Sequence, residues 1–225
     1  MTIGLDERSN REQIALAERF EPVYAAVGRH PNDAGGYDTD AAADILALAG
    51  HGKVRAIGET GLDFYRDTAD PEDQRRAFAS QIEIAAETGL PVVIHLRDRK
   101  GGDEAAAETF SMLDGAAGEL TVVLHCFSAA HRVEQAIERG WYCSFAGNVT
   151  YPANEDLREA AAKVPDELIL VETDAPYLTP QSRRRQRNEP AYVVETASVV
   201  AGARGVSTER LDRITTENSG RLFDW

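Results

Sequence analysis

Four short apolar runs in this sequence stop at, or just before, a histidine or a carboxylate. Apolar runs of this length, separated by helical patterns of roughly 10 to 15 residues, are typical of the buried strands of a parallel α/β sheet. The carboxyl ends of such strands are where α/β folds bind ligands, so polar residues there are candidates for chemistry. The four runs are 54–57, 90–94, 120–124 and 168–171, and the residues that follow them are Glu59, His95, His125 and Asp174.

Helix signals divide the rest of the sequence. The first expected helix begins at Ser9, which has the residue type of an N-cap, and Pro71 stands in the first turn of the third. The expected helices are 9–20, 38–49, 72–88, 102–113, 130–139, 154–163, 191–203 and 208–223.

The repeated placement of polar residues at strand ends favours a metal site. One glutamate after a strand is more often a loop residue bonded to nearby amides, and one histidine there is more often a satisfied core residue. Two histidines and two carboxylates at four strand ends are hard to explain by packing. Imidazole nitrogen and carboxylate oxygen suit Zn²⁺ and similar first-row divalent ions, whose catalytic sites take ligands from separate elements. We therefore predict that these four strand-end residues bind a divalent metal ion.

Six short motifs follow one another along the chain. They are Gly28–Pro31, Ile57–Asp63, Val93–Asp98, Leu124–Ser128, Glu172–Leu178 and Arg187–Pro190. In content and order these motifs resemble the TatD family of metal-dependent deoxyribonucleases, which belong to the amidohydrolase-like group of TIM barrels. The resemblance spans nearly the whole chain. It implies one metal-dependent hydrolase domain over residues 1–225, with an α/β, TIM-barrel-like (β/α)8 fold.

The predicted strands number about seven, one fewer than such a barrel requires. The resembling proteins carry a His-x-His pair on their first strand, and this sequence contains no such pair. We therefore expect a fold that lacks the first β/α unit. Three explanations stand: a start codon assigned too late, a shortened protein that closes differently or oligomerises, and a degenerate relic. The sequence leaves the oligomeric state open.

The resemblance also implies which metal ligands are kept. One ion of the family is held by the His-x-His pair, the aspartate of the last strand and a bridging glutamate, and a second ion by the bridging glutamate and two histidines. Carried over to this sequence, Glu59, His95 and His125 retain the second set. Asp174 lacks its two histidine companions. The expected cofactor is thus one or two divalent ions, Mg²⁺, Mn²⁺ or Zn²⁺.

Three further residues are candidates for substrate binding. His30 also follows a predicted strand, and the resemblance implies a contact with a substrate phosphate; a loop histidine bonded to backbone is an equal alternative. Arg66 lies beside aromatic residues in a loop expected at 63–67, which would either hold nucleic acid or pack down on the protein. Arg187 belongs to the basic cluster 181–190, whose arginines would clamp phosphates or remain in a solvated loop.

The composition limits how nucleic acid would be bound. A net charge of −14 repels a polyanion at long range, which counts against extended binding but allows a metal ion and a few arginines to act locally. No apolar run reaches the roughly 18 residues of a membrane span, and the N-terminal residues do not resemble a secretory signal. Two cysteines in 225 residues do not suggest a disulfide framework. We expect a cytoplasmic protein without a membrane partner.

The predicted function is metal-assisted hydrolysis of phosphodiester bonds in nucleic acid, as by a TatD-like DNase, with 3'-5' exonuclease action as one form; the sequence leaves exonuclease against endonuclease and DNA against RNA open. A divalent ion lowers the pKa of its bound water and polarises a phosphoryl oxygen. Glu59 and Asp174 are the expected catalytic carboxylates, and Asp174 either completes the coordination or takes the proton from the attacking water. Loss of the first β/α unit would impair this activity. The alternatives are a metal-dependent esterase or deacylase acting on aminoacyl-RNA, and a non-catalytic remnant that acts as a binding partner.

Overall fold

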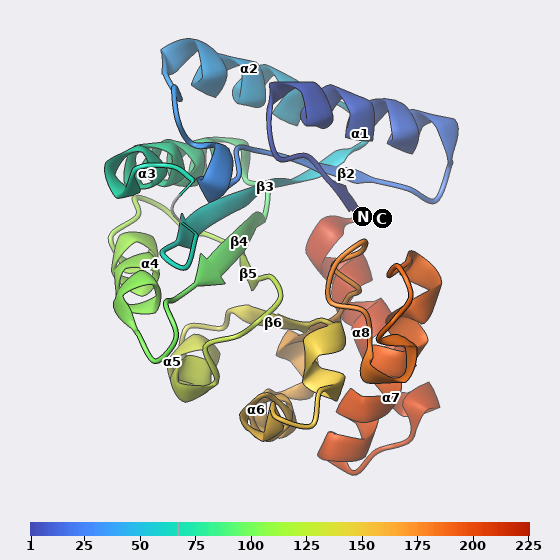
Figure 1. Ribbon diagram of the computed structural model, residues 1–225. Helices are drawn as coiled ribbons and strands as arrows, with labels where there is room; N and C mark the ends of the chain where they lie inside the picture. Colours follow the sequence, from blue (N-terminus) through green and yellow to red (C-terminus); the bar gives the residue numbers. More distant parts are fainter. Residues whose placement is uncertain (67) are drawn as a thin grey trace. The chain divides into compact units, whose positions relative to one another are not determined.

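A computed structural model describes residues 1–66 and 68–225 of the chain. Residue 67, the last of the loop expected at 63–67, lies outside the described residues. The described residues contain seven strands and eight α-helices, the numbers that the sequence predicts (Figure 1). They form two compact units, Met1–Val123 and Leu124–Trp225. None of the helices in these ranges is both long and apolar enough to cross a membrane.

Four parallel strands form the sheet of the first unit. They pair in sequence order and are β1 (Thr2–Ile3), β2 (Ala25–Val27), β3 (Val54–Asp63) and β4 (Val92–Arg97). The backbone N–H of Val92 donates to the carbonyl of Thr121 over 2.8 Å, just before β5 (Val122–Leu124) begins. The helices that pack on these strands are α1 (Glu7–Arg19), α2 (Thr39–Ala49), α3 (Pro71–Thr88) and α4 (Glu104–Asp114) (Figure 1).

The core of the first unit lies between the sheet and its helices. Ile57 and Leu62 on β3, Ile94 on β4 and Phe78 on α3 are fully buried. Parallel strands that are buried on both faces have few polar positions, because neither face meets water. This explains why the strands appear in the sequence as unbroken apolar runs.

β3 is longer than the sequence predicts. The expected strand stopped at Ile57, because the glycines that follow are weak strand formers. The structure continues the strand to Asp63. The pairing with β4 shifts register once after Ile57, and beyond the shift Gly61 pairs with His95. Glu59 therefore lies within the strand and not in a loop after it.

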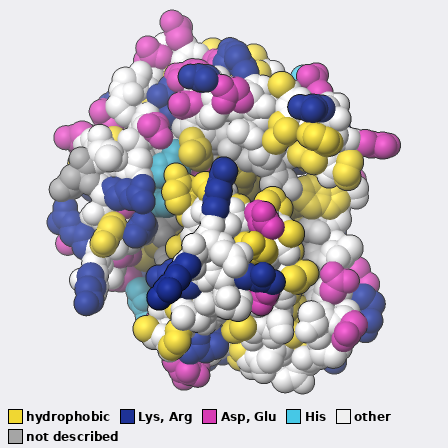
Figure 2. All heavy atoms as spheres, turned by 45° about the vertical axis from the view of Figure 1, so that its right-hand side comes forward, with side chains coloured by type: hydrophobic (Ala, Val, Ile, Leu, Met, Phe, Trp, Pro, Cys, Tyr) yellow, Lys and Arg dark blue, Asp and Glu magenta, His cyan; other side chains and the backbone are white. Residues whose placement is uncertain are grey.

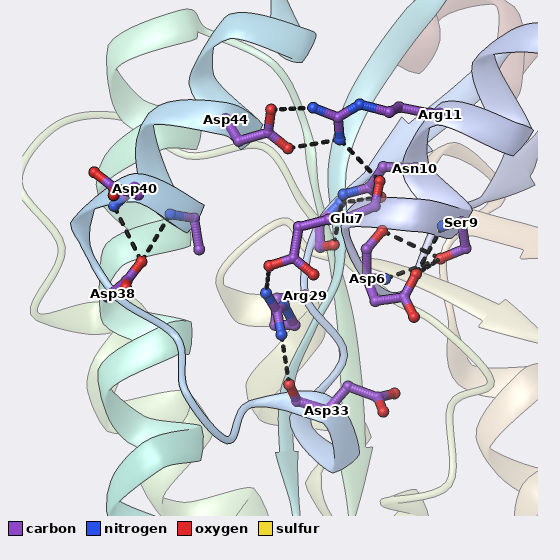
Figure 3. A network of polar contacts seen from close by, with 12 residues as sticks. Asp6, Glu7, Ser9, Asn10, Arg11, Arg29, Asp33, Asp38, Asp40 and Asp44 are labelled. Atoms are coloured by element: carbon purple, nitrogen blue, oxygen red, sulfur yellow. Dashed lines mark hydrogen bonds and ion pairs between the residues drawn. The ribbon is translucent and has the colours of Figure 1, made fainter.

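α1 begins earlier than the sequence predicts. The prediction of Ser9 as N-cap is wrong, since the cap is Asp6. Oδ1 of Asp6 accepts the backbone N–H of Ser9 over 2.7 Å, and Oγ of Ser9 accepts the backbone N–H of Asp6 over 2.9 Å (Figure 3). The two residues thus form a capping box, in which serine takes the place of the more common glutamate or glutamine. Both residue types cap helices, so the local sequence did not separate them.

We expect Asp6→Ala to lower the free energy of unfolding by about 1 kcal/mol at neutral pH, because it removes an N-cap. Hydrogen bonds from the Ser9 side chain and backbone hold the pKa of Asp6 below its usual value. A carboxylate with a depressed folded pKa stabilises above the pKa of the unfolded chain, about 3.9, and this contribution is lost as the pH falls through the folded pKa. Urea unfolding at pH 7 and at decreasing acidic pH measures the difference. A penalty that stays constant into acid would contradict the expectation.

The second unit holds two paired parallel strands, β6 (Tyr142–Phe145) and β7 (Ile169–Val171). Its helices are α5 (Val133–Glu138), α6 (Glu155–Lys163), α7 (Val193–Arg204) and α8 (Thr208–Phe223). α8 agrees with the prediction at both ends. α5 is shorter than the expected helix 130–139, because its first turn, Ala130–Arg132, is a 3₁₀ helix.

Candidate metal centre

Glu59, His95 and His30 lie together in the first unit. Nδ1 of His95 is 2.6 Å from Oε1 of Glu59. Nε2 of His30 is 3.3 Å from Nδ1 of His95 and 3.6 Å from Oε1 of Glu59. One nitrogen or oxygen of each residue falls within 4.8 Å of the others, as the ligands of one ion would. Imidazole nitrogens with a carboxylate are a donor set that fits a first-row divalent cation.

The register of β3 and β4 brings Glu59 and His95 together. Side chains alternate along a strand, so positions 59, 61 and 63 share one side of β3. His95 pairs with Gly61, which puts its ring between the carboxylates of Glu59 and Asp63. Gly61 permits this close approach, because a Cβ there would overlap the carbonyl oxygen of His95.

His95 therefore has a carboxylate on each side of its ring. Nε2 is 3.2 Å from Oδ2 of Asp63, and Nδ1 faces Glu59. Burial would lower the pKa of His95, but hydrogen bonds and charge from Asp63 and Glu59 outweigh burial and raise it. Burial would raise the pKa of Asp63, but the hydrogen bonds it accepts, from His95 first, hold it well below its usual value. The negative charge that favours an imidazolium here also favours a metal cation.

The ring nitrogen of His30 that faces Glu59 and His95 carries a hydrogen. Its Nδ1 accepts the backbone N–H of Asn32 over 3.0 Å. A neutral imidazole has one donor and one acceptor nitrogen, so the proton is on Nε2, which faces Glu59 and His95. Distance alone groups His30 with the metal ligands. The tautomer favours a hydrogen-bond donor instead, since a ring nitrogen that carries a proton cannot bind a metal.

Arg29 anchors the turn that carries His30. Its guanidinium donates to the carbonyl of Asp33 over 2.9 Å and pairs with the carboxylate of Glu7 (Figure 3). The backbone N–H of Arg29 donates to Oε1 of Gln81 over 2.8 Å. Arg29 is buried, and a buried charge has to be paired and hydrogen-bonded. These contacts fix the backbone on both sides of His30.

His125, Glu172 and Asp174 lie together in the second unit. Nδ1 of His125 is 2.9 Å from Oε1 of Glu172, and Nε2 is 3.7 Å from Oδ1 of Asp174. Oε1 of Glu172 is buried and makes no hydrogen bond with the residues that the structure describes. His125 thus has a carboxylate near each ring nitrogen, as His95 has in the first unit.

A buried asparagine, Asn188, links the segment that contains Arg187 to the segment that contains Asp174. Asp174 has a left-handed backbone with φ of 53°, a conformation that aspartate adopts more often than most residues. The side-chain amide of Asn188 donates to the carbonyl of Thr173 over 2.7 Å and to the carbonyl of Tyr177. These bonds tie the segment of Arg187, whose side chain is exposed, to the segment of Asp174.

Arg66 is exposed on the loop that follows β3. The backbone N–H groups of Tyr65 and Arg66 donate to Oδ1 of Asp63 over 2.9 and 3.0 Å. Phe64 is buried, whereas Tyr65 is 55% exposed and has the guanidinium of Arg97 4.2 Å from its ring centroid. One aromatic residue of the loop therefore packs inward and the other stays at the surface beside arginines, and the binding of nucleic acid by this loop stays a prediction.

The four predicted metal ligands form two pairs, one in each unit, and the meeting of both pairs at one ion stays a prediction. Asp63 and Glu172, the second carboxylate beside each histidine, were not among the residues predicted from the sequence. Both stand inside the motifs described above. Their positions in the sequence could have indicated them. Asp63 is four residues after Glu59, a spacing that puts two side chains on the same face of a strand, and Glu172 directly follows an apolar run.

Comparison with known proteins assigns the family. The model of the family described as TatD related DNase matches residues 1–224. The protein of Bacillus subtilis named uncharacterized metal-dependent hydrolase YabD is 35% identical over 225 residues, 99% of this chain and 86% of that protein. The 3'-5' ssDNA/RNA exonuclease TatD of Cronobacter sakazakii is 36% identical over 227 residues, 98% of this chain and 84% of that protein.

The crystal structure of the TatD homologue YJJV from Escherichia coli K12 superposes with a TM-score of 0.85 and 26% identity, covering 99% of this chain and 85% of that one. This agreement confirms the predicted α/β, TIM-barrel-like fold class, here with seven strands among the residues that the structure describes. The resemblance in the six sequence motifs is confirmed as well. The chain belongs to the TatD-related DNase family of metal-dependent hydrolases.

Proposed function

We propose that this protein hydrolyses phosphodiester bonds in nucleic acid and removes nucleotides from the 3' end of single strands. The observation that carries the proposal is the pair of Glu59 and His95 with His30 beside it, since cation ligands and a hydrogen-bond donor then lie at one place. The relative from Cronobacter sakazakii, named as a 3'-5' ssDNA/RNA exonuclease, supports the choice of substrate. The residues that would hold the cation are Glu59, His95, His125 and Asp174.

When bound, a divalent cation supplies a nucleophilic water at neutral pH and polarises a phosphoryl oxygen. Asp174 either completes the coordination of the cation or takes the proton from the attacking water, a role open to a carboxylate within hydrogen-bond reach. His30 donates its Nε2 hydrogen to a phosphate oxygen, in keeping with the tautomer set by Asn32. Arg66 and Arg187 bind other phosphates of the substrate with their exposed guanidinium groups.

The charge of the protein requires that phosphate contacts be local. Acidic side chains are spread over the face shown in Figure 2, and Lys and Arg side chains lie among them. With a net charge of −14 the protein repels a polyanion at distances where salt does not screen it. We therefore propose recognition of a strand end by a few arginines and a cation, and not of a long tract by a basic surface.

We also propose that residues 1–225 form one domain, because the family match runs from residue 1 to residue 224 without a break. The two compact units would then be the halves of one hydrolase.

A panel of substrates tests the reaction. The whole chain, with added Mg²⁺, Mn²⁺ or Zn²⁺, is incubated with single- and double-stranded DNA and RNA labelled at the 3' or the 5' end, and with aminoacyl-RNA. We expect stepwise loss of the 3' label from single strands, only with added metal. Release of the amino acid without cleavage of the strand would instead identify an esterase. The absence of turnover on every substrate would contradict both reactions.

We expect His30→Ala to lower kcat/KM on a single-stranded substrate by about 10- to 100-fold and to leave the affinity for Zn²⁺ close to that of the unmodified protein. The loss corresponds to one hydrogen bond to a charged group, about 1.5–3 kcal/mol. Zn²⁺ titration by calorimetry separates this role from ligation. A loss of Zn²⁺ affinity as large as that of His95→Ala would make His30 a metal ligand.

A further inference from the structure

The ring of His95 can bind a cation through only one of its nitrogens. Nδ1 faces Glu59 at 2.6 Å, and Nε2 lies 3.2 Å from the carboxylate of Asp63. A neutral imidazole carries a single proton, so a ring that offers Nδ1 to a cation has its hydrogen on Nε2. Asp63 is the acceptor on that side.

Asp63 is held in place independently of His95. It is 1% exposed. Its Oδ1 accepts two backbone N–H groups, as described above, and its Oδ2 accepts the amide of Asn32 over 3.0 Å. The side chain of Gln74 binds the backbone of Asp63 from both directions: Oε1 accepts its N–H over 2.9 Å, and Nε2 donates to its carbonyl over 3.2 Å. The position of the Asp63 carboxylate is therefore fixed by contacts other than that with His95.

We propose that Asp63 is a positioning residue that fixes the ring orientation and the tautomer of His95, so that Nδ1 is available to a divalent cation beside Glu59. Histidines that bind metals commonly donate their other ring N–H to a carboxylate, and loss of that partner typically costs 10- to 100-fold in metal affinity. This inference rests on the proposed function, which supplies the cation. The carboxylate of Asp63 also accepts the backbone N–H of Arg66. Asp63 therefore positions both His95, a proposed metal ligand, and Arg66, a proposed phosphate contact.

The variant Asp63→Asn separates these tasks. Asparagine keeps Oδ1 as acceptor for the two backbone N–H groups, but the NH₂ group in place of Oδ2 cannot accept the hydrogen on Nε2 of His95. Asp98→Asn is the matched control. The carboxylate of Asp98 lies three residues after His95 in the sequence and accepts the backbone N–H groups of Ala105 and Ala106 at the start of α4, over 2.7 and 3.1 Å.

Two measurements are made on the whole chain of each variant: Zn²⁺ titration by calorimetry, and ¹⁵N NMR of the histidine rings with and without Zn²⁺. We expect the unmodified protein to show hydrogen on Nε2 of His95. We expect Asp63→Asn to lose this signal and to bind Zn²⁺ about 10- to 100-fold more weakly. Asp98→Asn should match the unmodified protein in both respects. Equal Zn²⁺ affinity in Asp63→Asn and the unmodified protein would overturn the inference.

The NMR measurement also keeps the inference separate from the proposed function. If the unmodified protein binds none of Zn²⁺, Mg²⁺ and Mn²⁺, the proposed function fails, and metal-free spectra recorded at a pH at which the ring of His95 is neutral then decide the role of Asp63. An Nε2 hydrogen of His95 that persists unchanged in Asp63→Asn would overturn that role. If Asp63→Asn does not fold, the spectrum of the Zn²⁺-bound unmodified protein decides alone, because hydrogen on Nδ1 of His95 contradicts the inference and hydrogen on Nε2 supports it.

Discussion

Replacing His95 or His125 with alanine is expected to abolish metal-dependent hydrolysis, with a loss of kcat/KM of about 10³-fold or more. A cation contributes several kcal/mol of transition-state stabilisation, and each 1.36 kcal/mol corresponds to a factor of ten in rate. Each substitution also leaves carboxylates without the imidazole between them: Glu59 and Asp63 in one case, Glu172 and Asp174 in the other. Zn²⁺ affinity should fall together with activity.

His51→Ala is the matched control for these substitutions. His51 is a histidine of the first unit whose Nε2 lies 3.2 Å from Oε1 of Glu18, in a contact at the protein surface. Such surface contacts contribute little to stability, so the variant should keep both activity and Zn²⁺ affinity. Undiminished nuclease turnover by His95→Ala, in protein whose metal content has been measured, would remove His95 from the site.

The second large effect is expected from Gly61→Ala, which should lower the free energy of unfolding by about 3 kcal/mol or more. Gly61 has φ of 140°, a region that residues with a side chain rarely adopt, and an added Cβ would overlap the carbonyl oxygen of His95 on β4. Backbone strain and overpacking each cost about 1–3 kcal/mol. Because the overlap is with backbone, β4 must move and carry His95 away from Glu59.

Gly52→Ala is the control for this substitution. Gly52 lies in an exposed turn, and a Cβ there would meet no atom within 4 Å. Its substitution should change the free energy of unfolding by less than about 1 kcal/mol. Urea unfolding measures both variants, and Zn²⁺ titration reports the position of His95. A Gly61→Ala variant as stable as Gly52→Ala would show that β3 and β4 separate at little cost.

The sequence by itself determined the element order and the fold class, and it singled out the candidate site residues. A strand buried on both faces has to be apolar along its length, so the runs before Glu59, His95, His125 and Asp174 were visible without knowledge of their neighbours. Helix boundaries marked by a proline at the start or a glycine at the end, such as those of α3, could likewise be predicted from the local sequence. The wrong N-cap of α1 shows the limit, because Asp6 and Ser9 have the same local signal.

The tertiary structure alone decided which of these residues meet. Glu59 and His95 are 36 positions apart in the sequence and come together through the pairing of β3 with β4. That register depends on backbone hydrogen bonds between strands and on Gly61, which no local pattern reports. The role of Asp63 and the tautomer of His30 follow from the same contacts, since a hydrogen on one ring nitrogen is set by the partner of the other.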